Sequence, residues 1–516
     1  MTKKRYNEAK NISFNIELPK REKDLLAGKK VMLPLSKECN NRLSHSQDVE
    51  YVAEKIYRHL ISNNNDMFVN SLSLTKIKTI ALWHDVGHCP YGHSGEEKLN
   101  SLISENKGFY LDSFYSGYKH NLLSAKILLD LKTNVSWDII DAVIKHSSVL
   151  PKNFNLSRAN HNNILKLNYI FNCDRTNVIE ISDKKIAVNN SWYFFMRDFI
   201  SNFACGTCKI PKYNFINNND CEIIKICENF TDNRGKAKNI CRYCVTNKSN
   251  KNIKNNITKY LLFPYPLTLN GDIIRIADEI SSLVRDIEYY SKFLKANQKN
   301  KYYIIEEKIL DILNILKSKF IGQGKDFELI EKTKKLIKSE ITGDDLIDYL
   351  IKKLKYNSQS FEIIEKNKYN DIPLVLNWNN KDQKNYCIPL LNFEDDISVL
   401  FEAIKKAIYG IIHKDKIIKD NNTEGDNYIN KIFDFYYNNP NEFLKINDHL
   451  NDELNVITNT IKSMSCKTLV DKITYAKSHI NDNIDYMKLL NSFRREIAFY
   501  IARLTETELK EFCETI

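Results

Sequence analysis

The segment from His84 to His93 constrains the fold and the chemistry of this chain more than any other. It reads His-Asp-Val-Gly-His-Cys-Pro-Tyr-Gly-His, so three histidines and one aspartate stand around two glycines and a proline. Imidazole nitrogens suit first-row divalent metals, and a carboxylate adds a harder ligand. Core packing gives no reason for so many polar groups in one short stretch. The segment therefore predicts a metal site.

Further metal ligands are expected on helices that pack around this segment. Seven of the eleven histidines lie between residues 45 and 146. His45 begins one stretch with apolar residues at helical spacing, and Asp278 lies in another such stretch. Helices that each deliver one or two inward side chains can build a metal site in a helical core. The histidines expected to be ordinary packed or surface residues are His59, His161, His413, His449 and His479.

Apolar residues at helical spacing predict a mainly α-helical fold. The spacing recurs over about 42–150, 273–287, 300–355 and 395–516, whereas residues 356–395 include prolines and an apolar run that predict short strands. A polar, irregular N-terminal arm is expected to pack loosely. The expected organisation is this arm at 1–30, the first part of the metal-binding domain at 31–200, a cysteine-rich insertion at 201–256, the last-ligand helix of the domain at 257–300, and a helical C-terminal region at 301–516 that completes the fold.

Two pairs of cysteines mark the insertion. Cys205 and Cys208 form one C-x-x-C pair, and Cys241 and Cys244 form another, in a segment rich in asparagine and lysine. Four thiolates with this pairing suit a tetrahedral structural Zn²⁺. A polar segment of this size cannot build a hydrophobic core without such a staple. We therefore predict a structural zinc site, with unliganded thiols or a redox dithiol as the alternatives.

Composition limits the class of protein. Hydrophobic residues make up 43% of the chain and charged residues 27%, as in ordinary soluble globular proteins. The sequence shows neither an export signal nor an apolar run long enough to span a membrane, which predicts a cytoplasmic protein with no membrane partner. The net charge of +11 comes from lysines scattered along the chain. Because no basic stripe interleaved with aromatic residues stands out, a nucleic-acid partner has no specific support.

Several segments, in this order along the chain, resemble the motifs of one known family. They are Arg42-Leu-Ser-His-Ser46, the block from His84 to Glu96, Lys119-His-Asn121, Lys145-His-Ser147, Tyr265-Pro-Leu-Thr268, Ile276-Ala-Asp-Glu-Ile-Ser281, Asp286-Ile-Glu288 and Tyr500-Ile-Ala-Arg-Leu-Thr-Glu506. The family is that of the dGTPase-like deoxynucleoside triphosphate triphosphohydrolases, within the HD-domain superfamily. The resemblance implies a helical HD-domain core. It also implies hydrolysis of dGTP, or of a broader set of dNTPs, to deoxynucleoside and tripolyphosphate.

The resemblance also implies roles for individual residues. The implied ligands of a divalent metal (Mn²⁺, Mg²⁺ or Fe²⁺) are His45, His84, Asp85 and Asp278. His93 is the candidate proton donor to the departing 5′ oxygen, with Glu96 and His120 orienting or tuning it. The residues implied to bind substrate are Arg42 and His88, at phosphate oxygens, and Asp286, at the sugar 3′-hydroxyl.

The chain also departs from the family pattern. Ser282 stands where the family commonly has a tyrosine against the sugar, which leaves base and sugar preference open. Arg503 and Glu506 stand where glycine and aspartate are usual. Family members are generally homo-oligomers, some respond to a nucleotide bound away from the active site, and a role in phage defence is a further expectation. Two alternatives remain: an HD phosphodiesterase or nucleotidase acting on another phosphate ester, and a nucleic-acid-binding or partner-binding module with a vestigial HD site.

Overall fold

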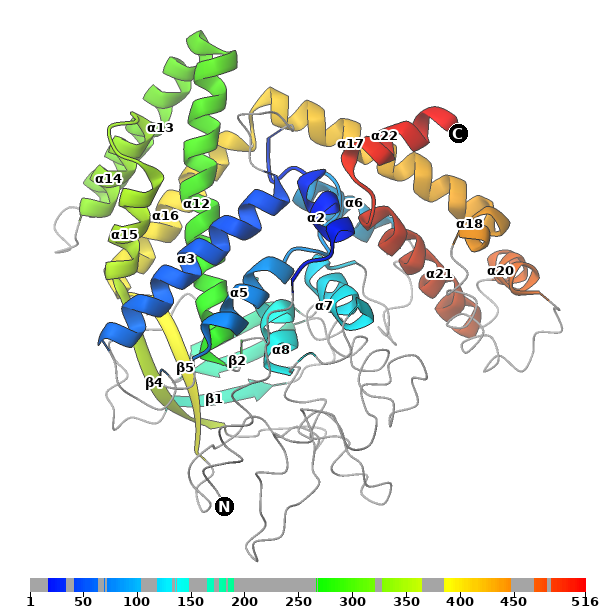
Figure 1. Ribbon diagram of the computed structural model, residues 1–516, viewed down its shortest axis with the longest axis horizontal. Helices are drawn as coiled ribbons and strands as arrows, with labels where there is room; N and C mark the ends of the chain where they lie inside the picture. Colours follow the sequence, from blue (N-terminus) through cyan, green and yellow to red (C-terminus); the bar gives the residue numbers. More distant parts are fainter. Residues whose placement is uncertain are drawn as a thin grey trace, which may run out of the picture.

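Helices dominate the part of the chain that the structure describes, as the sequence predicted (Figure 1). The structure is a computed structural model. It describes residues 17–33, 41–63, 69, 72–103, 118–131, 135, 137–147, 165–170, 176–181, 184–189, 266, 268–320, 327–363, 385–446, 468–479 and 484–516. The cysteine-rich insertion predicted at 201–256, with its C-x-x-C pairs, lies outside these residues.

One long helix, α12 (Leu269–Asn297), runs through the middle of the molecule, and most of its residues are buried (Figure 1). Thr268 caps it, because its hydroxyl accepts a hydrogen bond from the backbone N–H of Gly271. The helices of the metal-binding domain pack on and near it: α3 (Arg42–Asn63), α5 (Leu74–Trp83), α6 (Gly92–Ile103), α7 (His120–Leu131) and α8 (Trp137–Lys145). Helices far apart in the sequence therefore share one core around α12.

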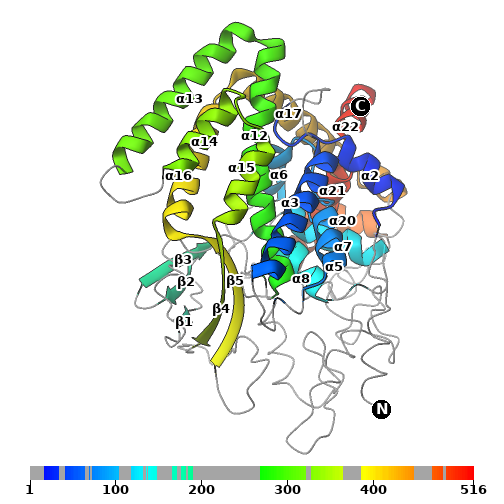
Figure 2. The ribbon, with the colours of Figure 1, turned by 60° about the vertical axis from the view of Figure 1, so that its left-hand side comes forward.

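The C-terminal half forms two groups of helices on either side of this core (Figures 1 and 2). The first group comprises α13 (Lys299–Phe320), α14 (Glu328–Ile337), α15 (Gly343–Lys352) and α16 (Asp395–Ile412). The second comprises α17 (Lys416–Asn438), α18 (Pro440–Ile446), α20 (Leu469–Ser478), α21 (Ile484–Ala502) and α22 (Glu506–Thr515). Helix α17 joins the two groups and packs on α6. The described helices of the C-terminal half thus pack around the same core.

A mixed five-stranded sheet lies at one end of α12 (Figure 2). Its strands are β1 (Leu165–Ile170), β2 (Thr176–Ile181), β3 (Lys184–Asn189), β4 (Leu354–Ile363) and β5 (Asn385–Phe393), in the order β3-β2-β1-β4-β5. Only the β1–β4 pair is parallel, with Leu165 opposite Phe361. The short strands predicted within 356–395 are confirmed by β4 and β5, but β1 to β3 were not predicted. A buried pair on α12 holds the sheet, because Asp272 accepts from the N–H of Leu391 and Arg275 donates to its carbonyl.

The expectation of a loose N-terminal arm is wrong for the residues described there. Residues 20–27 form α2 (Lys20–Ala27), and Lys29 and Lys30 are fully buried. Both lysines find polar partners, which explains how the buried positions tolerate them. The local sequence of the arm does not reveal these partners, since they lie 59 to 473 residues away.

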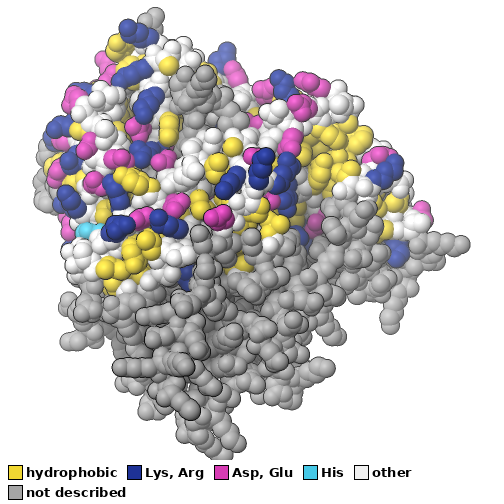
Figure 3. Space-filling view, viewed as in Figure 1, with side chains coloured by type: hydrophobic (Ala, Val, Ile, Leu, Met, Phe, Trp, Pro, Cys, Tyr) yellow, Lys and Arg dark blue, Asp and Glu magenta, His cyan; other side chains and the backbone are white. Residues whose placement is uncertain are grey.

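Charged side chains of both signs are mixed on the face shown in Figure 3, and the described residues form no continuous basic stripe there. This mixture agrees with lysines scattered along the sequence. Among the described helices, none combines the length and the apolar character needed to cross a membrane.

Candidate active site

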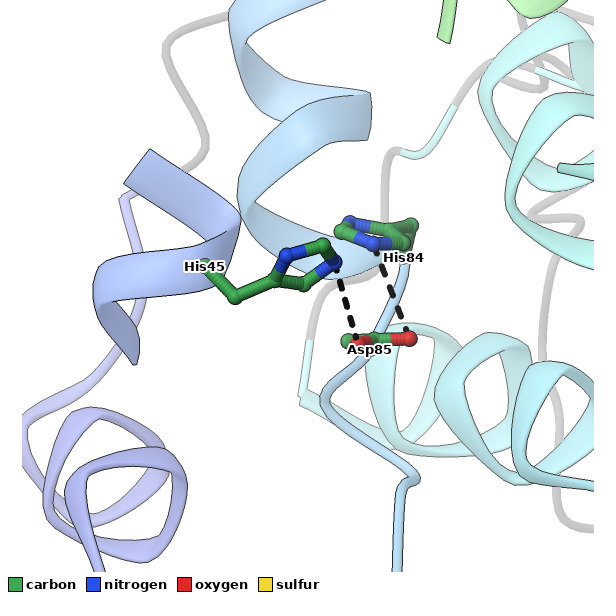
Figure 4. Close-up of side chains that lie close together, drawn as sticks. All are labelled: His45, His84 and Asp85. Atoms are coloured by element: carbon green, nitrogen blue, oxygen red, sulfur yellow. Dashed lines mark ion pairs between the residues drawn. The ribbon is translucent and has the colours of Figure 1, made fainter. Parts of the chain in front are cut away.

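The four predicted metal ligands come together from three helices and one turn. His45 lies in the first turns of α3, and Asp278 in the middle of α12. Helix α5 ends at Trp83, so that His84 caps it and Asp85 follows in the turn. His45, His84 and Asp85 are buried and face one another (Figure 4). The end of α5 thus lets two adjacent residues reach one point.

Distances between the ligand atoms suit a single cation. His45 Nε2 lies 3.0 Å from Asp278 Oδ1 and 3.8 Å from Asp85 Oδ2. His84 Nε2 lies 3.6 Å from Asp85 Oδ1 and 3.9 Å from Asp278 Oδ1. Donors each about 2.1 Å from one ion would be separated by roughly 3–4 Å.

Hydrogen bonds prepare His84 as a ligand. Its Nδ1 donates to the carbonyl of Ala81 at 2.6 Å, which leaves a lone pair on Nε2 in the neutral ring. That Nε2 is buried and has no hydrogen-bond partner among the described residues. An unpaired buried lone pair beside two carboxylates costs free energy unless a cation takes it up. The donor set therefore fits a divalent metal.

Electrostatics keep both carboxylates ionised. Burial disfavours the charged form of Asp85, but His84 and the Arg42 guanidinium outweigh it and hold the pKa of Asp85 well below its usual range. Burial likewise opposes ionisation of Asp278, and the hydrogen bond and charge of His45 lower its pKa below its usual range. Carboxylates held in the charged form are ready to bind a cation.

The predicted catalytic residues form a second cluster beside the metal ligands. His120 Nδ1 donates to Glu96 Oε2 at 2.7 Å, and the same oxygen lies 3.8 Å from His93 Nδ1. The pKa of Glu96 is lowered because His120 outweighs the effect of burial. The His93 side chain is 76% exposed, whereas Glu96 and His120 are buried. Glu96 thus links a buried imidazole to an exposed one.

His88 lies between these two clusters. Its ring stacks on that of His120 with centroids 4.3 Å apart and meets the ring of His93 at 5.2 Å. Neither of its nitrogens has a hydrogen-bond partner among the described residues. Burial and the nearby Arg42 lower the pKa of His88 well below its usual range. His88 therefore presents a neutral ring to any ligand.

A pocket of about 670 Å³ opens onto both clusters. All ten residues predicted as ligands, catalytic groups or substrate contacts either line it or contact a residue that does. The lining ones are Arg42, His45, Asp85, His88, His93, His120, Asp278 and Asp286, whereas His84 contacts Asp85 and Glu96 contacts His120. Arg42 faces the pocket, and its NH1 donates to Asp85 Oδ2 at 2.5 Å. Asp286 is buried and accepts from the Tyr409 hydroxyl at 2.8 Å. Burial raises the pKa of Asp286 to about 6.

The pocket has a wall that the sequence analysis missed. Helix α16 contributes Lys405, Tyr409 and His413, spaced four residues apart. Lys405 Nζ lies 3.8 Å from Glu279 on α12. His413, expected from the sequence to be an ordinary packed or surface residue, lies in this wall. Only the four-residue spacing could have pointed to this helix face, and many helices show such spacing.

His146 was grouped with the sequence motifs but given no role. It lies just after α8, its Nδ1 donates to the carbonyl of Val143, and its Nε2 lies 3.2 Å from His120 Nε2. Burial lowers the pKa of His146 to about 3.

Ser282 also lines the pocket and donates to Asp278 Oδ1 at 3.3 Å.

Comparison with known proteins defines the class of this site. Residues 42–178 match the family model described as the HD domain. The segment holds all of the implied metal ligands except Asp278. The HD-domain part of the resemblance found in the sequence is therefore confirmed over this segment.

Curated relatives carry the name deoxyguanosinetriphosphate triphosphohydrolase-like protein. The one from Rickettsia bellii (strain RML369-C) is 27% identical over 271 residues, which are 51% of this chain and 61% of the relative. The one from Rickettsia rickettsii (strain Iowa) is 25% identical over 279 residues, 52% of this chain and 64% of the relative. The one from Rickettsia akari (strain Hartford) is 35% identical over 130 residues, 24% of this chain and 28% of the relative. The chain thus matches less than two thirds of each of these relatives.

Proposed function

We propose that the protein is a metal-dependent phosphohydrolase that cleaves deoxynucleoside triphosphates to deoxynucleoside and tripolyphosphate. The observation that carries the proposal is that the buried His45, His84 and Asp85 and the partly exposed Asp278 lie together beside a pocket lined by His93. The names of the curated relatives support the choice of substrate. A divalent metal bound there would activate water and offset the charge of the α-phosphate.

The residues around the metal ligands take separate roles in this proposal. His93 gives a proton to the departing 5′ oxygen, since it is the exposed member of its cluster. Glu96 and His120 orient His93 and tune its proton affinity, because the Glu96 carboxylate lies between the two imidazoles. Arg42 and His88 face the phosphate oxygens, and Arg42 keeps an Nε without a partner among the described residues.

Asp286 and the α16 wall form the opposite side of the pocket. Asp286 accepts from Tyr409, and a second hydroxyl, such as the sugar 3′-hydroxyl, can donate to the same carboxylate. Ser282 fills less of this side of the pocket than a tyrosine would. The pocket therefore has room for a sugar 2′-hydroxyl, and both ribonucleotides and deoxyribonucleotides are candidate substrates. Homo-oligomer formation, regulation by a second nucleotide, phage defence and the zinc site stay predictions from the sequence.

Product analysis tests the proposal. The purified protein is incubated with Mn²⁺, Mg²⁺ or anaerobic Fe²⁺ and with each dNTP and rNTP, singly and mixed. Release of tripolyphosphate is the expected result. Orthophosphate, pyrophosphate or cleavage of another ester would instead favour an HD phosphodiesterase or nucleotidase. No turnover together with tight nucleic-acid binding would favour a binding module.

The Asp85→Ala variant tests the site itself. We expect activity to fall by at least about a thousandfold, since it removes a carboxylate shared by both imidazole ligands. His59→Gln is the control, because His59 lies on the same helix as His45 and is not among the residues that line the pocket. A fully active Asp85→Ala protein would exclude this site assignment.

A further inference from the structure

The turn between α5 and α6 is held by residues from both ends of the chain. This turn, Val86–Tyr91, carries His88 and leads into α6 with His93. Lys29 Nζ donates to the carbonyl of His88 at 2.7 Å and to the carbonyl of Ala502 at 2.8 Å. Figures 1 and 2 show α2 beside the junction of α21 and α22. One buried ammonium group thus joins the turn to the C-terminal helices.

Glu506 makes a second connection at the same place. Its Oε1 accepts from the backbone N–H of Lys30 and from that of Tyr91, both at 3.1 Å. Its own backbone N–H donates to the carbonyl of Gly28 at 3.1 Å. A single residue therefore ties the N-terminal segment, the turn and α22 together. Glu506 closes the C-terminal motif found in the sequence, to which the proposed function gives no role.

The turn needs this support because its backbone is strained. Tyr91 has a φ of 64°, in the left-handed region that non-glycine residues rarely adopt, and Gly92 follows with a φ of 61°. Such conformations persist where the surroundings over-determine them. Two contacts hold Tyr91 in this conformation. Its backbone N–H donates to Glu506, and its ring packs so closely on Gly425 that a Cβ there would lie 2.2 Å from the ring.

His88 depends on the same support. Its ring nitrogens have no hydrogen-bond partner among the described residues, so its position comes from stacking on His120 and from its backbone. Lys29 fixes the carbonyl of that backbone. The left-handed conformations of Tyr91 and Gly92 set the direction in which α6 leaves the turn, and therefore the position of His93.

We propose that Glu506 and Lys29 are positioning residues, through which the C-terminal motif holds His88 and His93 in the geometry that the pocket requires. This inference rests on the proposed function for its kinetic consequence. It concerns the turn Val86–Tyr91 and not the four predicted metal ligands, all of which lie outside the turn. Asp85 directly precedes it in the sequence. Metal content is therefore expected to survive loss of the support.

The pair Glu506→Ala and Glu506→Gln tests the proposal. Both accepted bonds go to the single atom Oε1, which a glutamine retains and an alanine lacks. We expect Glu506→Ala to lower kcat about tenfold to a hundredfold with KM within about twofold, because small displacements of catalytic groups act on the reacting step. We expect Glu506→Gln to recover kcat to within about threefold. Metal content, measured by elemental analysis, should match the parent in both variants.

Arg21→Ala is the matched control. It removes an exposed ion pair with Glu508, which joins the same two segments without contacting the turn. Its kcat should equal that of the parent. An unchanged kcat in Glu506→Ala, or a loss that Glu506→Gln does not restore, would overturn the proposal.

Hydrogen–deuterium exchange of the full-length protein separates this inference from the proposed function. Peptides covering Tyr91 should exchange faster in Glu506→Ala than in the parent, Glu506→Gln or Arg21→Ala, whether or not the parent hydrolyses nucleotides. Equal exchange in all four proteins would overturn the role of Glu506. Faster exchange in Glu506→Ala, combined with a parent that lacks activity, would overturn only the proposed function.

Discussion

Asp286 shows at the scale of one residue how burial sets the working range of the pocket. Its pKa is raised to about 6 because the apolar surroundings disfavour the carboxylate, although the Tyr409 hydroxyl donates to it. Above that pH both oxygens of the carboxylate can accept hydrogen bonds, and below it one oxygen carries a proton and can donate. The group therefore changes its hydrogen-bonding character within the range in which enzymes are assayed.

We expect KM to fall as pH rises from 5 to 7, because the ionised Asp286 accepts a ligand hydroxyl more strongly. In Asp286→Asn this part of the pH dependence should vanish and KM should stay high. Steady-state kinetics at constant ionic strength measure both. A pH profile of KM that is the same in the two proteins would contradict the assignment of Asp286 to the substrate.

The same shift has a defined sign in stability. The folded pKa of Asp286 lies above that of an unfolded aspartate, so the native state binds more protons between about pH 4 and 6. The contribution of this group to stability is present below about pH 4 and is lost as pH rises through about 6. Asp286→Asn should therefore gain stability relative to the parent over this window, which thermal unfolding at several pH values would show.

At the scale of helices, the turn after α5 sets how closely α7 packs on the metal-binding residues. A Cβ at Gly87 would lie 2.3 Å from the carbonyl of His120 and from the backbone N of Ser124. The backbone N–H of Gly87 donates to the Ser124 hydroxyl, which in turn donates to the carbonyl of His84. The first turns of α7 can thus approach the metal ligands only because residue 87 has no side chain.

We expect Gly87→Ala to destabilise the fold by about 1–3 kcal/mol, as backbone must shift to admit the methyl group. It should also reduce activity, because His120 moves with α7. Gly410→Ala is the control: a Cβ there meets nothing within 4 Å, and alanine favours the helix. Thermal or denaturant unfolding of the two variants measures the difference. Equal stabilities would contradict the close packing of α7 on the turn.

Local sequence accounts for the helices and for the metal ligands, but not for the whole pocket. His84 and Asp85 stand in a dense motif, and His45 and Asp278 lie on strongly periodic helices, so four ligands follow from short stretches of sequence. The alternation of apolar and polar residues in Leu165–Ile170 would have indicated a strand by its period of two. Its pairing with β4 joins residues nearly two hundred positions apart, which no local pattern encodes.

The α16 wall was missed for the same reason. Lys405 lies beside Glu279 and Tyr409 donates to Asp286, and both partners are on α12, more than a hundred positions away in the sequence. The buried lysines 29 and 30 look like surface residues until their partners at positions 88, 422 and 502 are known. Long-range partners, rather than motif residues, thus escape sequence reasoning.

At the scale of the whole molecule, the predicted metal ligands join three helices, α3, α5 and α12, which packing and the ion pairs Lys78–Glu54 and Arg285–Asp48 also hold together. In the folded protein the ionised carboxylates of the buried Asp85 and the partly exposed Asp278 both lie within 4 Å of His45 Nε2, and a bound cation would offset their repulsion. Since the unfolded chain has no preformed site, binding of the cation stabilises the fold.

We therefore expect chelation to lower the midpoint of thermal unfolding and added Mn²⁺ to restore it. A metal at a hundred times its Kd contributes roughly 2.7 kcal/mol. The Asp85→Ala variant should respond to neither treatment. A parent whose unfolding midpoint ignores both chelator and metal would argue against a metal bound at this site.

The bond between Glu506 and Tyr91 also bears on when the protein becomes active. The two residues are 415 positions apart, so at about 5–20 residues per second a ribosome needs roughly 20 to 80 s to make the second after the first. During that time the metal ligands of α3 and α5 already exist while the turn between them and His93 lacks its anchor. If the proposed function holds, a nascent chain would turn over substrate more slowly than the finished protein until Glu506 has been made and anchors the turn.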